Sequence, residues 1–344
     1  MPKNQHRIRT AVFFGAACFS VLTALCLNAI AEPVTLALSG SLTSSSTGGV
    51  TVGAGAYTIQ QLAEVGAAIG TVTADGRTGV PLWGLLGGNS TGTASDVVTD
   101  SGKNAILRSY LLATNSSGFQ AVISMGELDP FFGGKGSDSP FIAFSGPTGS
   151  PALVFPQMNA AGRNIENLTS LQVLSVPALP VGPGGLSTSL MLSGNVSSPG
   201  TYTLADLKKF PPVTETVSGD IYTGVSLWTL LSANDSNVFT QYVLAAGTDG
   251  YEVLFSLAEL DPSLAAQNNL LPYADTAGQF PADGFVRIVI PGDNHAGRYV
   301  SNLNQLEVTS IPEPSTLLLL GWSLLALCSL RCSYKLPDAK LKEE

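Results

Sequence analysis

An internal duplication constrains the fold of this chain more than any other feature. Four blocks of sequence occur twice, in the same order and at nearly constant separations of 145, 132 and 135 residues. The matched pairs are 57–62 with 202–207, 79–86 with 224–231, 110–130 with 242–262, and 162–173 with 297–308. Repetition of several blocks in one order indicates two tandem copies of one folding unit.

The duplication divides the 344 residues into segments. The Pro/Gly-rich run PALPVGPGGL has the composition of a linker, and each repeat has the length of an ordinary domain. We expect a signal peptide at 1–31, a first repeat at 32–176, the linker at 177–186, a second repeat at 187–310, a C-terminal sorting segment at 311–335 and a polar tail at 336–344.

Local signals within the repeats predict an α+β fold with more sheet than helix. Thr58 with Gln61, and Thr203 with Asp206, have the spacing of a capping box at a helix start. Pro211-Pro212 ends the helix of the second repeat. We expect short helices at 81–86 and 226–231, with Trp83 and Trp228 facing inward, and strands at 242–248, 251–257 and 285–290.

Both ends of the chain resemble sorting signals. Basic residues precede an apolar run, 11–27, and the small residues Ala29 and Ala31 follow it, which predicts a secretory signal cleaved after Ala31. Near the other end, Pro312-Glu313-Pro314 precedes a second apolar run and then Arg331. This run is a little short for a bilayer span, and its basic flank predicts a transmembrane segment with a cytoplasmic end.

Composition excludes several functions. Residues 32–311 carry 21 acidic and nine basic side chains, which argues against nucleic-acid binding. All four cysteines lie in the two terminal segments, so the repeats have no thiolate for catalysis or metal binding. His295 is the only histidine between those segments, and one histidine cannot build a zinc site.

Two resemblances follow from these motifs. The Pro-Glu-Pro motif, the apolar segment and the basic flank together resemble the PEP-CTERM sorting tail of exported Gram-negative proteins, which implies an exosortase-type processing enzyme as a partner. The block order, with TDGYEVLFSLAELDP and the segment 286–308, resembles the molybdopterin-binding domain of the sulfite oxidase superfamily. The resemblance covers most of the second repeat and, in degraded form, the first.

The second resemblance implies a molybdenum ligand that this chain lacks. In that family a cysteine thiolate binds the metal. The matching stretch here, 211–224, contains Ser218 but no cysteine, and has Val-Ser-Gly-Asp at 217–220 where Cys-Ala-Gly-Asn is expected. A hydroxyl is a far poorer anionic ligand than a thiolate. The first-repeat stretch, 71–79, also lacks cysteine. We therefore expect no metal site and no catalytic residue, although molybdopterin remains an open alternative.

The best candidate for binding a cofactor phosphate is the cluster Asn294, His295 and Arg298, together with Ser218. A glycine beside an arginine lets the backbone approach an anion while the guanidinium grips it. The alternative is a structural Arg298 that pairs with Asp293 or Asp261. The first repeat keeps Gly162-Arg163 but has Met158 and Ala160 in place of Asp293 and His295.

Two pairs of carboxylates, Glu127 with Asp129 and Glu259 with Asp261, have a spacing compatible with acid–base chemistry. Because the motif occurs in both repeats and ends in Asp-Pro, we favour a turn with the intervening leucine in the core.

These observations predict an exported, envelope-associated protein with tandem molybdopterin-binding-like domains, acting in binding or structure without redox catalysis. The alternative is a molybdopterin-dependent oxidoreductase of the sulfite oxidase superfamily. A third hypothesis is a secreted matrix or surface component whose ligand is a glycan. Expected partners are the membrane, through the C-terminal segment, and a small anionic ligand or an envelope glycan, but no nucleic acid. The expected location is the periplasm, the outer envelope or the extracellular space.

Overall fold

A computed structural model describes residues 34–311, except 48, 90–96, 101, 103, 134–138, 145–148, 157–160, 232–237, 266–267, 279 and 281–283. The predicted cleavage site at Ala31, the Pro312-Glu313-Pro314 motif and the apolar segment after it lie outside the described residues. Among the helices within these ranges, none is long and apolar enough to span a membrane.

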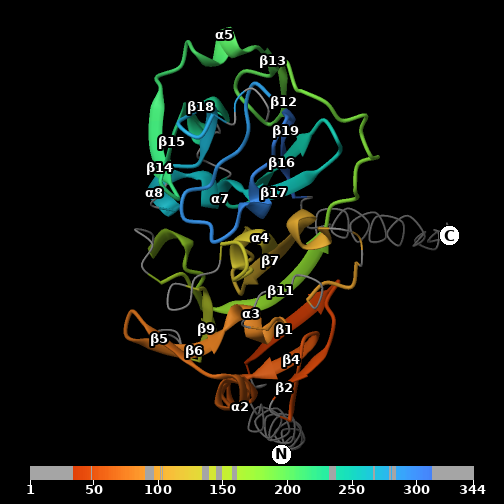
Figure 1. Cartoon of the computed structure of the whole chain (residues 1–344). Coiled ribbons are helices and arrows are strands. Elements are labelled where there is room, and N and C mark those ends of the chain that lie inside the picture. Colours follow the sequence, from red (N-terminus) through yellow and green to blue (C-terminus); the bar gives the residue numbers. More distant parts are fainter. Residues whose placement is uncertain are drawn as a thin grey trace, which may run out of the picture.

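The first half of the described chain forms a five-stranded, a four-stranded and a two-stranded sheet with short helices between the strands (Figure 1). Its elements are β1 (Thr35–Gly40), β2 (Ser45–Thr47), β3 (Val50–Val52), β4 (Gly55–Thr58), α2 (Ile59–Ile69), β5 (Val72–Ala74), β6 (Arg77–Pro81), α3 (Leu82–Leu85), η2 (Ala105–Arg108), β7 (Ser109–Asn115), β8 (Gln120–Ser124), α4 (Met125–Leu128), β9 (Phe141–Ala143), β10 (Ala152–Val154), η4 (Ala161–Arg163) and β11 (Leu168–Ser175).

The second half repeats this succession after a linker, 177–186, in which the structure places neither helix nor strand. Its elements are β12 (Leu190–Gly194), β13 (Gly200–Tyr202), α5 (Leu204–Leu207), β14 (Val213–Val217), β15 (Asp220–Ser226), α6 (Leu227–Leu231), β16 (Gln241–Gly247), β17 (Glu252–Ser256), α7 (Leu257–Leu260), α8 (Pro262–Ala265), β18 (Leu270–Asp275), η6 (Ala296–Arg298) and β19 (Leu303–Ser310).

The two halves share the topology of their larger sheet, while the smaller sheet has one strand more in the first half. The larger sheet has the order β4-β1-β11-β7-β8 in the first half and β13-β12-β19-β16-β17 in the second. In each, one parallel pair, β1 with β11 or β12 with β19, lies among antiparallel pairs. The smaller sheets are β10-β9-β6-β5 and β14-β15-β18. The mixed, mainly β architecture agrees with the expected α+β class.

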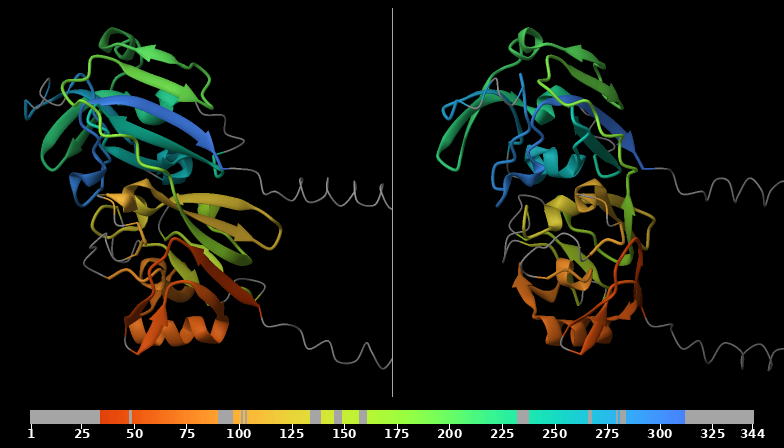
Figure 2. Two further views of the ribbon diagram at one scale, coloured as in Figure 1. Left: turned by 90° about the vertical axis from the view of Figure 1, so that its right-hand side faces the viewer. Right: turned by 45° about the vertical axis from the view of Figure 1, so that its right-hand side comes forward.

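The halves stack on each other, with β7 and α4 of the first facing β17 and α7 of the second (Figures 1 and 2). Each larger sheet turns one face toward the core, because its strands alternate buried and exposed residues. Leu36 and Leu38 of β1 and Leu306 and Val308 of β19 are buried in this way.

Most of the expected local elements are present. Both capping boxes form, at Thr58 and Thr203, and α5 ends before Pro211. Trp83 is buried, whereas Trp228 is only half-buried. The strand expected at 285–290 is not formed. Val289 makes an isolated bridge to Leu270 of β18 and Arg287 donates to Pro272 of the same strand, but Ile288 donates to Val300, and no regular ladder forms.

One glycine tests the tight packing of the smaller sheets. A Cβ atom on Gly224 of β15 would lie 2.0 Å from the carbonyl oxygen of Leu271 in β18, which is backbone and cannot move aside. We expect Gly224→Ala to destabilise the protein by about 1–3 kcal/mol in urea unfolding. Gly200→Ala is the control, because a Cβ there meets no atom within 4 Å, and it is expected to leave stability nearly unchanged.

Candidate functional site

Equivalent residues of the two repeats touch each other where the halves meet. Tyr110 and Tyr242, which are 132 positions apart, stack with ring centroids 5.4 Å apart. The backbone N–H of Val122 in β8 donates to the carbonyl of Phe239 at 2.7 Å. Val122 and its counterpart Leu254 also share one buried cluster with Tyr110. A contact in which equivalent surfaces face each other has the character of a two-fold interface within a single chain.

Two short helices position a glutamate on each side of this contact. Ser124 caps α4, its hydroxyl accepting from the N–H of Glu127 at 3.1 Å. Ser256 caps α7 in the same way for Glu259, at 3.2 Å, and the Glu259 carboxylate accepts in return from the N–H of Ser256. The strand–serine–helix sequence therefore carries each glutamate to the same point of its repeat.

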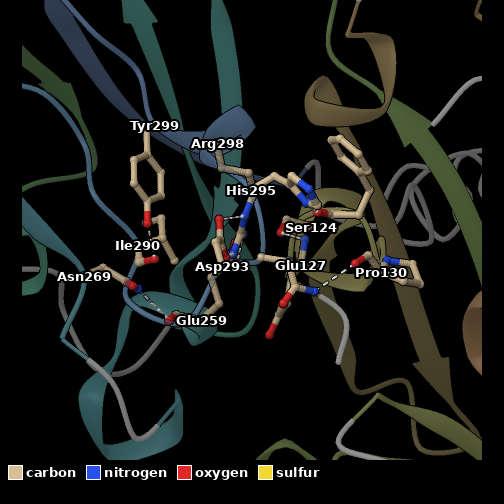
Figure 3. A network of polar contacts seen from close by, with 12 residues as sticks. Ser124, Glu127, Pro130, Glu259, Asn269, Ile290, Asp293, His295, Arg298 and Tyr299 are labelled. Carbon is tan, nitrogen blue, oxygen red and sulfur yellow. Dashed lines mark hydrogen bonds and ion pairs between the residues drawn. The ribbon is translucent and has the colours of Figure 1, made fainter. Parts of the chain in front are cut away.

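Each glutamate holds the arginine of its own repeat. Both nitrogens at the end of the Arg163 side chain bond to Glu127, with Nη2 to Oε2 at 2.9 Å. Arg298 donates from Nη1 to Glu259 at 2.7 Å. It also grips Asp293 through Nη2 at 2.6 Å and Nε at 2.9 Å. Figure 3 shows Arg298 among these carboxylates, with the first half beside them.

The arginine of the second repeat lies between the two halves. Arg298 is 1% exposed and its Cδ is 2.8 Å from the position of a Cβ on Gly126 of α4, in the first half. Burial works to lower the pKa of Arg298, but Asp293 and Glu259 raise it more, so the guanidinium stays charged. Each of its three nitrogens already bonds to a carboxylate, and the side chain is buried, so an external anion would have to compete with Asp293 and Glu259.

The carboxylate partner is under opposite influences. The pKa of Glu259 is raised to about 7 overall. Burial and the nearby Glu127 carboxylate raise it, and Arg298 lowers it. Asp129, at the end of α4, is fully buried, and burial raises its pKa to about 6. Its Oδ1 accepts from the N–H of Phe131 at 2.8 Å, while Oδ2 has no hydrogen-bond partner among the described residues.

The other two residues of the predicted cluster bind the opposite half. Asn294 donates from its side chain to the carbonyl of Pro130 at 2.9 Å and from its backbone to Phe132 at 2.7 Å. His295 donates from Nδ1 to the carbonyl of Phe131 at 2.6 Å. Its ring also stacks on that of Phe131, with centroids 4.1 Å apart and planes 1° from parallel. Asn294 and His295 thus clamp the 130–132 turn of the first repeat.

Ser218 lies elsewhere in the fold. It is exposed, with φ of 53°, and forms with Gly219 a two-residue turn between β14 and β15, whose last pair is Val217 with Asp220. Positive φ at both positions is the signature of a tight hairpin turn. Asp75 and Gly76 make the same turn in the first repeat. No hydrogen bond or ion pair among the described residues joins Ser218 to Arg298, His295 or Asn294.

The contacts match the structural interpretation of Arg298 rather than the anion-binding one. Asp293 is its partner as expected, but the second partner is Glu259, not Asp261, because Asp261 turns back to cap its own Asp-Pro turn. Met158 and Ala160 lie outside the described residues. Within the described ranges no three His, Cys, Asp or Glu side chains are arranged to hold a metal ion.

Sequence reasoning missed the contact between the repeats. Glu127, Glu259, Arg163 and Arg298 are retained in both copies of a chain in which only 12% of residues are charged. That retention was the available signal, because a buried charge needs a partner and two retained opposite charges are natural partners. The sequence could not show that the pairs face each other across the two halves.

Comparisons with known proteins add little to this description. No family model matches the chain, and no curated protein matches it. The crystal structure of the sulfane dehydrogenase SoxCD from Paracoccus pantotrophus is similar over 39% of this chain and 42% of its own length, with 18% identity and a TM-score of 0.29. The match therefore spans less than half of that protein, and a similarity at this level supports no functional argument.

A matched pair of glycines tests the contact between the halves. A Cβ on Gly297 would lie 2.0 Å from the ring of Phe132, whereas one on its counterpart Gly162 would meet only the end of Leu264, at 3.1 Å. We expect Gly297→Ala to lower the free energy of unfolding by about 1–3 kcal/mol, since the ring must move. Gly162→Ala should cost clearly less in the same urea titration. Equal effects of the two substitutions would contradict tight packing of Gly297 against Phe132.

The buried Asp129 predicts a pH dependence of stability. Its raised pKa means that the folded state binds this proton more tightly than the unfolded state, so its contribution to stability falls as pH rises from about 4 through about 6. Asp129→Asn should therefore stabilise the protein at about pH 8, by at most about 3 kcal/mol, and have little effect at about pH 4.

Asp261→Asn is the matched control for this measurement. Asp261 makes the same turn, accepting from the N–H of Ser263 at 2.8 Å, but it is only half-buried. Chemical unfolding of both variants at the two pH values is the measurement. A gain for Asp129→Asn that does not depend on pH would contradict an ionised, buried Asp129.

Proposed function

We propose that the protein is an exported, cell-envelope-associated module built from two sulfite oxidase-like repeats, and that it binds a ligand or builds structure without molybdenum redox catalysis. The single observation that carries the second part is the state of Arg298. The arginine best placed by sequence to hold a cofactor phosphate is buried and forms ion pairs with both Asp293 and Glu259.

The residues predicted to bind molybdopterin, Asn294, His295, Arg298 and Ser218, do not fit that group. A phosphate needs free donors, but Arg298 has three acidic contacts, and Asn294 and His295 donate to carbonyls of the first repeat. A molybdenum ligand should point into a closed site, but Ser218 lies on an exposed hairpin turn. We therefore derive no reaction step through the cofactor.

Export and anchoring rest on the sequence alone. The basic and apolar N-terminal segment supports secretion with cleavage after Ala31, and Pro312-Glu313-Pro314 with its apolar run supports processing by an exosortase-type enzyme. On this proposal the repeats operate outside the cytoplasm and are held at the membrane until the tail is processed. The absence of cysteine from 32–311 means that the repeats rely on packing and ion pairs rather than disulfides.

Metal and pterin analysis of the protein purified from its native host tests this proposal. We expect neither molybdenum nor pterin fluorescence in stoichiometric amount, because Arg298, Asn294 and His295 are engaged in contacts within the protein and residues 32–311 contain no thiol. Ser218→Cys, which supplies a thiol within the matching stretch 211–224, should stay free of molybdenum, since the turn is exposed. Stoichiometric molybdenum in the unaltered protein would instead establish the alternative, a molybdopterin-dependent oxidoreductase.

A further inference from the structure

The two repeats differ most clearly in the length of their first helix. Both helices start at a capping box, but α2 continues for 11 residues, Ile59–Ile69, whereas α5 ends after four, Leu204–Leu207. Pro211-Pro212 explains the difference, because proline cannot continue a helix. The second repeat therefore lacks the helical turns that, in the first, carry the buried Val65 and Gly66.

This early end leaves a shallow cavity of about 470 Å³ that is wide open to solvent, lined by Gly200, Thr201, Tyr202, Asp206, Lys209 and Phe210. Its size lies within the range of small-molecule sites. Phe210 occupies the position that Val65 has in the first repeat, but it is half-buried where Val65 is covered. In Figure 1, α5 and β13 lie at the end of the second half that is far from the first half, so the contact between the repeats does not cover the cavity.

Two aromatic rings form walls of this cavity. Tyr202 and Phe210 have centroids 6.4 Å apart and planes inclined at 46°. The hydroxyl of Tyr202 donates to the carbonyl of Ser198 at 2.7 Å, which fixes the ring. Gly200 adds no side chain, and a Cβ there would meet nothing within 4 Å, so the cavity is open at this point. Fixed aromatic faces of this kind suit a ligand with apolar C–H surfaces.

A charged pair beside the rings supplies polar contacts. The Lys209 ammonium donates to Asp206 Oδ1 at 2.8 Å, and Asp206 Oδ2 accepts from the backbone and hydroxyl of Thr203. An ammonium has three N–H donors, of which this contact uses one. Thr201, which is exposed, adds a hydroxyl that can donate and accept. The pair has no net charge, so the site has no preference for an anion from these two groups.

From this arrangement we infer that the cavity between β13 and α5 binds a neutral saccharide chain. Sugar rings present C–H faces that pack on aromatic rings and hydroxyls that both donate and accept, which is the combination that Tyr202, Phe210, Lys209 and Asp206 offer. The inference rests on the proposed role as a non-catalytic binding module and names its ligand class. The acidic character of residues 32–311 also favours a neutral over an acidic glycan.

Binding of neutral tetrasaccharides of glucose, galactose and mannose, measured by saturation-transfer NMR and calorimetry, tests the inference. We expect at least one to bind with a Kd of about 1 mM or tighter. Lys209→Ala and Phe210→Ala should each weaken that binding roughly tenfold or more, because each removes one wall or donor of the cavity.

Lys208→Ala is the matched control. It removes the same charge one residue away, but Lys208 lies over the ring of Tyr273, at 5.5 Å, and does not line the cavity. Its affinity should equal that of the unaltered protein. Lys209 is 75% exposed, so Lys209→Ala remains informative even if Phe210→Ala fails to fold.

Three outcomes would overturn the inference: no binding of any neutral tetrasaccharide, binding that Lys209→Ala and Lys208→Ala weaken equally, or binding of tetragalacturonate alone. These results are separate from the molybdenum and pterin analysis. A protein free of cofactor that binds no saccharide would contradict only the ligand class, whereas stoichiometric molybdenum with intact saccharide binding would contradict only the proposed absence of redox catalysis.

Discussion

Arg163 and Arg298 are charged side chains that water scarcely reaches, and each is kept in place by carboxylates of its own repeat. Removing such a group from water costs several kcal/mol, which only well-placed partners offset. The short helices α4 and α7 and their serine caps provide that placement. The contact between the halves forms around these pairs, so the relative position of the repeats depends on them.

The two repeats share this arrangement but do not use it equally. Met158 and Ala160 stand in the first repeat where the second has Asp293 and His295, which add a bidentate ion pair and a contact that clamps the first repeat. In the first, Arg163 has Glu127 and the ring of Phe155, 4.2 Å from its guanidinium. Residues that resemble a phosphate-binding motif therefore serve to join the halves. A buried network of this kind favours one register of packing over others more than it adds net stability.

One surface available to a ligand lies away from this contact. The hairpin turns at Asp75-Gly76 and Ser218-Gly219 are exposed and tight. The early end of α5 opens a cavity at the distant end of the second half instead. The first helix of the first repeat, α2, thus packs against the core along its length, whereas its shorter counterpart α5 leaves the neighbouring surface accessible.

The sequence alone determined the duplication, the α+β class, the capped helix starts at Thr58 and Thr203 and the turn at each Asp-Pro, because these depend on neighbouring residues and on spacing within one repeat. The sequence also shows that all four cysteines lie outside the two repeats. Only the tertiary structure decided the role of Arg298 and His295 and the failure of 285–290 to form a strand. The physical reason is that these residues take their partners from other elements of the fold: His295 contacts Phe131, 164 residues away, Arg298 pairs with Glu259, 39 residues away, and Val289 bridges to Leu270 of β18. Local sequence carries no record of which surfaces will meet.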